Sequence, residues 1–107
     1  MAQFIISGRH IELTEALKAY AEEKTAKLPK HFDNLIEIEV IIDGSDPSNP
    51  VVGMIARAPK TPPFIITETS DDAYKCIDLA VHKLERQIRK SKEQQRGSKH
   101  IGGTETV

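Results

Sequence analysis

The sequence predicts an α+β fold, a two-layer sandwich in which a four-stranded sheet carries two helices on one face in the order β-α-β-β-β-α. Residues 36–40 alternate strictly between apolar and acidic side chains, which is typical of a strand with one buried face. Residues 73–88 place apolar side chains at helical spacing, which is typical of a helix with one buried face. The length of 107 residues fits one such domain.

Local signals mark the first strand and the start of the first helix. Residues 4–7 are β-prone and end at Gly8, which predicts a short strand. Thr14 can cap a helix, because its hydroxyl can accept a hydrogen bond from a free backbone N–H of the first turn. Glu15 follows in that turn, where the positive end of the helix dipole stabilises an acid. We therefore expect a helix to begin there.

The first helix carries an apolar stripe that contains a lysine. Its apolar members are Leu17, Tyr20, Ala21 and Leu28. Lys24 falls in the same stripe, so its ammonium either reaches solvent from the stripe edge or faces a polar partner. Pro29 removes a backbone donor and disfavours helix at the residue before it, so the helix should end or kink there.

Three further strands should follow the first helix. The predicted strands are residues 36–42, 51–58 and 64–69. Residues 43–50 are dense in turn formers and predict a loop, and the proline-rich residues 59–63 predict a tight break. The sheet face that carries Glu37 and Glu39 lies opposite the helices, so we expect it to be solvated or to contact a partner.

The second helix should cover the same face of the sheet as the first. Ser70 is suited to cap it, and Asp71 and Asp72 would lie in its first turn. Its apolar stripe consists of Ala73, Ile77, Ala80, Val81, Leu84 and Ile88. We expect the domain to span residues 1–96 and residues 97–107 to form a flexible C-terminal tail.

The composition excludes several classes of protein. A single cysteine cannot form an internal disulfide framework, and no CxxC pair offers a zinc site. The longest apolar runs are far shorter than the roughly 20 residues that span a bilayer, and the first residues show no secretory signal. We therefore expect a cytoplasmic protein with no membrane partner.

No catalytic or metal-binding constellation stands out. The histidines lack metal-site spacing, and no phosphate-binding glycine loop is present. Asp78 and His82 lie four residues apart, which favours an ordinary surface pair on a helix over an acid–base pair. Cys76 should be a small half-buried side chain. We expect no enzyme, cofactor, metal or small-molecule substrate; a small enzyme that uses Asp78, His82 or Cys76 is the alternative.

Charge is segregated along the chain. The formal net charge is −1, from 15 Lys+Arg and 16 Asp+Glu. Residues 82–107 hold 7 basic and 3 acidic side chains, whereas residues 1–81 have a net charge of −5. A basic end on an acidic body favours an anionic partner. The alternative is that cations near the end of a helix merely stabilise its dipole, which accounts for only part of the excess.

The cations are spaced for binding phosphates. The second helix places Lys83, Arg86 and Lys90 on one face, with Arg89 on the neighbouring face. Near the end of the first helix lie Lys24, Lys27 and Lys30. Without interleaved aromatic side chains, such cations favour contacts with the backbone of a folded RNA or duplex that is recognised by its shape. A solvated basic helix is the alternative.

Two groups of residues, taken together, resemble one known family. The first group is Ile6-Ser7-Gly8, Thr14-Glu15-Ala16-Leu17, Lys24-Thr25-Ala26-Lys27-Leu28 and Phe32-Asp33. The second group is Asp72-Ala73-Tyr74-Lys75-Cys76-Ile77-Asp78 and Lys83-Leu84-Glu85-Arg86-Gln87-Ile88-Arg89-Lys90. Over residues 3–93 the chain resembles the ribosome hibernation promoting factor family, which includes ribosome-associated inhibitor A. It departs from the family in Ala73, which replaces a methionine, and in Lys75-Cys76, which replace two alanines.

The resemblance implies the same fold and a non-enzymatic role in translation regulation. Members bind the small ribosomal subunit between head and body and block the messenger RNA and transfer RNA sites in dormant cells, as in stress or stationary phase. The resemblance implies ribosomal RNA contacts for Lys24, Lys27, Lys83, Arg86 and Lys90, with Arg89 and Lys92 as additions. We expect the short form of the family, monomeric off the ribosome. The alternative is a generic double-stranded-RNA-binding or protein-binding α+β module.

Overall fold

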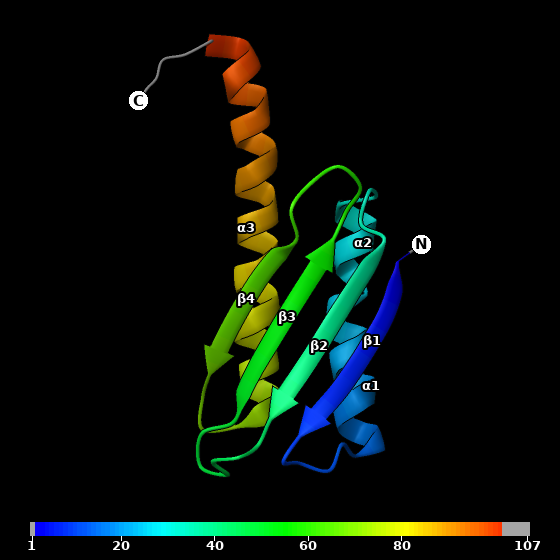
Figure 1. The fold of residues 1–107 in the computed structure, drawn as a ribbon, viewed down its shortest axis with the longest axis vertical. Helices are drawn as coiled ribbons and strands as arrows, with labels where there is room; N and C mark the ends of the chain where they lie inside the picture. The colour runs from blue at the N-terminus through cyan, green and yellow to red at the C-terminus, as the bar shows by residue number, and fades with distance from the viewer. Residues whose placement is uncertain (1, 102–107) are drawn as a thin grey trace.

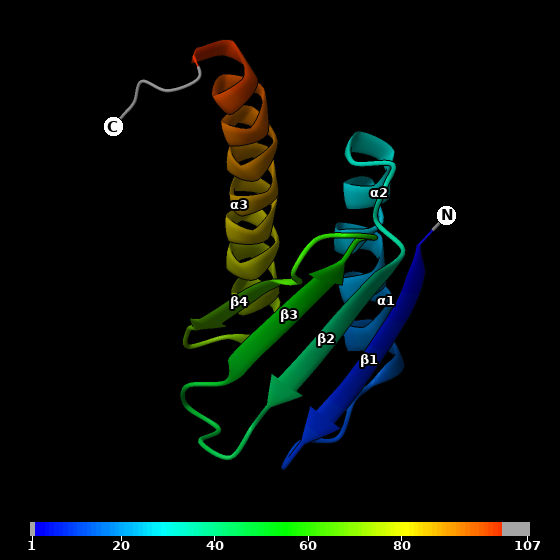
Figure 2. The same cartoon turned by 45° about the horizontal axis from the view of Figure 1, so that its top comes forward.

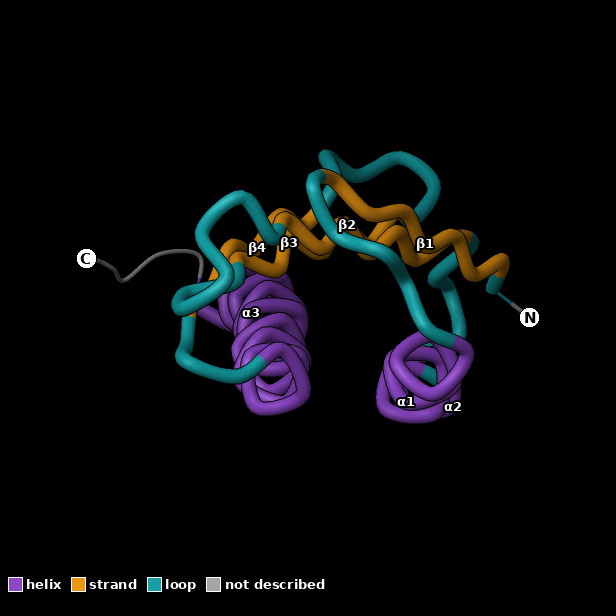
Figure 3. Tube along the Cα trace, turned by 90° about the horizontal axis from the view of Figure 1, so that it is seen from below, coloured by secondary structure: helices purple, strands orange, loops and turns teal. Residues whose placement is uncertain are grey.

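The computed structural model describes the backbone of residues 2–101 and the side chains of residues 2–92. Its elements are β1 (Gln3–Arg9), α1 (Glu15–Thr25), α2 (Lys27–His31), β2 (Glu37–Asp43), β3 (Val51–Arg57), β4 (Phe64–Thr69) and α3 (Ala73–Ile101). The strands form one sheet in the order β1-β2-β3-β4, in which β1 and β2 are parallel and the other neighbours are antiparallel. The helices cover one face of this sheet (Figures 1 and 3), which confirms the predicted two-layer fold.

The core lies between the sheet and the helices. It receives Ile38, Val40 and Ile42 from β2, Val52, Met54 and Ala56 from β3, and Ile77, Ala80, Val81, Leu84 and Ile88 from α3. Every second residue of β2 and β3 is therefore buried, as the alternation predicts. Ile36 is an exception: it precedes β2 at the end of the sheet and is 54% exposed, so it does not extend the buried set.

Both long helices begin at a side-chain cap. The Thr14 hydroxyl accepts a hydrogen bond from a first-turn N–H at 3.1 Å, which confirms that prediction. The prediction for the second helix is wrong, because Asp72 rather than Ser70 lies next to the first turn. The Asp72 carboxylate accepts a hydrogen bond from the Tyr74 N–H at 2.9 Å, whereas the Ser70 hydroxyl bonds to Asp71.

Pro29 divides the first helical segment in two. α1 ends at Thr25 and α2 begins at Lys27, so the break lies one turn before the proline. Proline cannot donate to the carbonyl four residues earlier, which belongs to Thr25, and its ring crowds that carbonyl. The predicted position is therefore wrong, because the break lies at Ala26 and Leu28 is helical; the break places Lys27 on a short helix of its own.

α3 is the longest element and extends past the end of the sheet (Figures 1 and 2). The helix continues to Ile101, so it includes the first residues of the segment 97–107 that was expected to be a tail. Residues 102–107 lie outside the described residues. Within the described part of the chain, no helix is both long enough and apolar enough to cross a bilayer.

Candidate RNA-binding face

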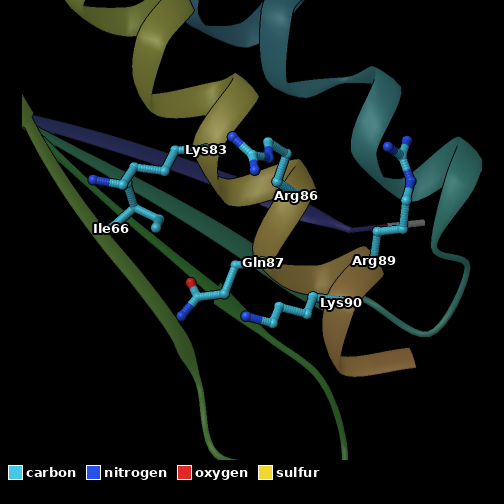
Figure 4. Close-up of a pocket in the computed structure, with 6 residues that line it drawn as sticks. All are labelled: Ile66, Lys83, Arg86, Gln87, Arg89 and Lys90. Atoms are coloured by element: carbon cyan, nitrogen blue, oxygen red, sulfur yellow. The ribbon is translucent and has the colours of Figure 1, made fainter. Parts of the chain in front are cut away.

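Four of the predicted cations meet on α3. The described residues that line an open depression beside β4 are Ile66, Lys83, Arg86, Gln87, Arg89 and Lys90 (Figure 4). Its volume is about 510 Å³. The helix can present so many charges because its apolar stripe faces the sheet and leaves the rest of its circumference to solvent.

The cations of α3 differ in how far their charge is already neutralised. The Lys83 ammonium lies 2.8 Å from the carboxylate of Glu68 in β4. Among residues 2–92, Arg86 and Lys90 form no ion pair. A cation that is paired with a carboxylate attracts a phosphate less strongly, so Arg86 and Lys90 are better placed than Lys83 to bind one.

Glu85 connects the cations of α3 with α2. Its carboxylate lies 3.1 Å from the Arg89 guanidinium on the same helix and 3.7 Å from the Lys27 ammonium on α2. The Glu85 side chain is only 15% exposed, so its carboxylate pairs with Lys27 and Arg89 while it is largely buried beneath them. This arrangement brings Lys27, which is far from α3 in sequence, next to the cations of α3.

Two more of the predicted lysines lie over aromatic rings. The Lys92 ammonium lies 5.4 Å from the ring centroid of Phe32, and the Lys24 ammonium lies 5.2 Å from that of Tyr20. At these distances a cation is attracted to the ring face. The place of Lys24 in an apolar stripe is thereby explained, because its charge has a partner at the stripe edge.

All seven predicted RNA-binding residues belong to the helices that cover one face of the sheet. We call them the basic face: Lys24, Lys27, Lys83, Arg86, Arg89, Lys90 and Lys92. The structure links five of them through shared surroundings, since Lys27 and Arg89 share Glu85 and four line one depression. Lys92 lies over Phe32 just after α2, and Lys24 lies over Tyr20. Their contact with RNA stays a prediction.

The opposite face of the sheet has a different charge pattern. Glu37 and Glu39 lie there, as predicted, and Arg57 of β3 donates hydrogen bonds to both carboxylates. Ile65 of β4 is 58% exposed on the same face. Because Arg57 there is paired with two acids, an anionic partner is favoured on the helical side of the molecule.

Two tyrosines and an aspartate form a cluster that the sequence analysis missed. The Tyr20 hydroxyl donates to the two Asp78 oxygens at 2.8 and 2.9 Å, and Tyr74 packs edge-to-face on Tyr20 at 5.0 Å between ring centroids. The hydrogen bond to Asp78, together with desolvation, raises the pKa of Tyr20. The expected surface pair of Asp78 with His82 is wrong, because Asp78 bonds to Tyr20 instead and no such pair occurs among residues 2–92.

The three candidate catalytic side chains do not converge. Cys76 is fully buried rather than half-buried, and its thiol donates to the Glu68 carbonyl at 3.1 Å. Burial raises the pKa of this thiol, so it is a poor nucleophile at neutral pH. Asp78 and His82 are instead exposed. In the described part of the chain, no cluster of His, Cys, Asp and Glu side chains could hold a metal ion.

The sequence matches the family described as "Sigma 54 modulation protein / S30EA ribosomal protein" over residues 4–96. It is 38% identical over 88 residues to a ribosome hibernation promotion factor of Bacillus subtilis, a match that covers 81% of this chain and 47% of that protein. It is 33% identical over 93 residues to a ribosome hibernation promoting factor of Pseudomonas putida, covering 87% of this chain and 89% of that protein. The chain thus spans about half the length of the Bacillus relative.

Two solved structures have the same fold. A ribosomal subunit interface protein from Coxiella burnetii superposes with a TM-score of 0.76 and 27% identity, over 85% of this chain and 99% of that one. The N-terminal domain of Protein Y from Thermus thermophilus superposes with a TM-score of 0.72 and 27% identity, over 84% of this chain and 98% of that one. The arrangement of sheet and helices described above is therefore shared with both proteins.

Proposed function

Because the chain belongs to the Sigma 54 modulation protein / S30EA ribosomal protein family, we propose that it is a ribosome hibernation factor. In this proposal it binds the small ribosomal subunit and blocks translation by occupying the sites of messenger RNA and transfer RNA. Its similarity to two ribosome hibernation factors and to a ribosomal subunit interface protein supports the proposal. The observation that carries it is the basic face.

The basic face suits the backbone of a folded RNA. Each phosphate that a cation neutralises releases a counterion, so a set of spaced cations gives strong binding at low salt. The cations come from three helices and not from one groove, which favours a broad RNA surface recognised by its shape. The depression beside β4 and the shared carboxylate of Glu85 keep most of them together.

Inhibition in this proposal is steric and needs no chemical step. A folded domain held against ribosomal RNA excludes other ligands from the volume that it fills. We therefore propose a factor that acts without catalysis or cofactor, as a monomer off the ribosome, in the cytoplasm where ribosomes work.

Co-sedimentation with purified small subunits tests the proposal. The variant Lys83→Ala/Arg86→Ala/Lys90→Ala removes three exposed cations from the basic face. It should keep the wild-type melting temperature, because these side chains lie outside the buried stripe, and should lose most of its binding. A matched control is Arg9→Ala/Lys18→Ala/Lys75→Ala, which removes the same charge from positions outside the basic face, two of them exposed and Lys18 half-buried.

The outcomes separate a specific site from general charge attraction. If both triple variants bind like the wild type, the basic face is not the binding surface and the proposal fails. If both lose binding equally, attraction depends on net charge alone, which also contradicts it. Equal affinity of the wild type for small subunits and for an unrelated RNA duplex would favour the alternative of a generic RNA-binding module.

A further inference from the structure

The depression between β4 and α3 has an apolar floor and a polar rim. Ile66 of β4 is 6% exposed and forms the floor. Among the described residues that line it, Gln87 is the one uncharged polar side chain. Figure 4 shows the Gln87 and Lys90 side chains extending in the same direction from α3, while Lys83 lies near Ile66. The volume of about 510 Å³ lies in the range of pockets that hold small ligands.

The charges around this pocket favour an anion such as a phosphate. Lys83 is paired with Glu68, and Arg89, although it lines the depression, points away from Ile66 in Figure 4 and is paired with Glu85. Arg86 and Lys90 remain to bind an anion. A free nucleotide and a phosphodiester within an RNA strand would both be attracted by these two cations, so competition between them decides which one the pocket takes.

Gln87 indicates which base the pocket prefers. Its amide offers a donor and an acceptor side by side, and glutamine pairs in this way with the N6 and N7 atoms of adenine. Adenine also presents a donor next to an acceptor, N6 and N1, on its pairing edge. Uracil also presents a donor next to an acceptor on its pairing edge, so adenine is preferred because it offers a second matching edge, and its ring face can pack on Ile66.

We propose that this pocket receives one unpaired adenosine nucleotide of the bound RNA. The base packs on Ile66 and bonds to the Gln87 amide, and its phosphate lies between Arg86 and Lys90. The inference rests on the proposed function, because it names the nucleotide that an RNA on the basic face would insert. It adds a base-reading residue to a surface otherwise built to bind the backbone.

Fluorescence anisotropy with labelled RNA oligonucleotides tests the inference. The probes are a short oligouridine and the same strand with one central adenosine. The wild type should bind the adenosine strand about fivefold more tightly, the lower end of what a well-made side-chain–base pair gives. Gln87→Met keeps the side-chain length but cannot form the hydrogen bonds, so it should bind the two strands with equal affinity. Lys90→Ala should weaken both strands equally.

The controls separate this inference from the proposed function. The inference is overturned if the wild type binds both strands equally, or if Gln87→Met keeps the preference for the adenosine strand. Either result stands even if the triple variant of the basic face loses small-subunit binding. Retained small-subunit binding by that triple variant would instead overturn the proposed function. AMP is then added as a competitor. If AMP displaces the adenosine strand and binds more tightly than the strand does, the pocket belongs to a free nucleotide and the RNA inference is overturned. Failure of millimolar AMP to displace it would support the inference.

Discussion

Removal of Arg86 should change the salt dependence of small-subunit binding more than removal of Lys83. Each phosphate contact contributes roughly 0.7–0.9 to the slope of log affinity against log salt concentration. Arg86 has no carboxylate partner among residues 2–92, so Arg86→Ala should lower the slope by that amount. The Lys83 charge is held 2.8 Å from Glu68, so Lys83→Ala should leave the slope nearly unchanged.

The reverse perturbation should strengthen binding. Glu68→Gln keeps the shape of the side chain and removes its charge, which frees Lys83 to contact a phosphate. The slope should then rise by roughly 0.7–0.9, and the affinity at low salt should increase. In the double variant Glu68→Gln/Lys83→Ala this gain should disappear, which shows that it comes from the freed lysine.

Binding of a fluorescently labelled chain to small subunits, measured over a series of potassium chloride concentrations, gives these slopes directly. Thermal melts of each variant check that the fold is intact. If Lys83→Ala lowers the slope as much as Arg86→Ala, or if Glu68→Gln leaves it unchanged, then pairing with Glu68 does not neutralise Lys83, and the ranking of the cations by their partners is wrong.

Two further predictions concern the stability of α3. In urea titrations, Asp72→Ala should lower the free energy of unfolding by about 1 kcal/mol, because the Asp72 carboxylate caps the helix. Ser70→Ala should lower it less. The opposite order would show that Ser70 is the cap. Burial raises the pKa of the Cys76 thiol above 9.0, so the unfolded chain loses this proton first as pH rises, and the free energy of unfolding should fall above about pH 9.0. Cys76→Ala should lack this part of the fall, and identical pH profiles for the two proteins would contradict the assignment.

Local patterns in the sequence predict most of the fold. The alternation around Ile38 and the helical spacing from Ile77 to Ile88 each report one buried face, and the structure confirms both. The start of α3 could not be fixed in this way, because Ser70 and Asp72 are both good caps and the direction of the incoming chain decides between them. Helix spacing likewise gathers the cations of α3 on its exposed side.

What the sequence could not reveal are contacts between residues far apart in the chain. Glu68 neutralises Lys83 from a neighbouring strand, and Tyr20 bonds to Asp78 across 58 residues. The periodicity of apolar residues indicates which way a side chain faces, but not which group it contacts. Three features therefore depend on how the helices pack on the sheet. They are how strongly each cation can attract a phosphate, the reduced availability of Asp78, and the pocket around Gln87.

The parallel pairing of β1 with β2 has a consequence for synthesis of the chain. β2, β3 and β4 are joined by short loops and can form a meander early, whereas β1 can join it only after the crossover through α1 and α2 is closed. Until then the edge of β2 exposes unpaired backbone groups that could recruit a strand from another nascent chain. The acids Glu37 and Glu39 lie along that edge. We expect their charges to disfavour such misassembly until β1 has paired with β2.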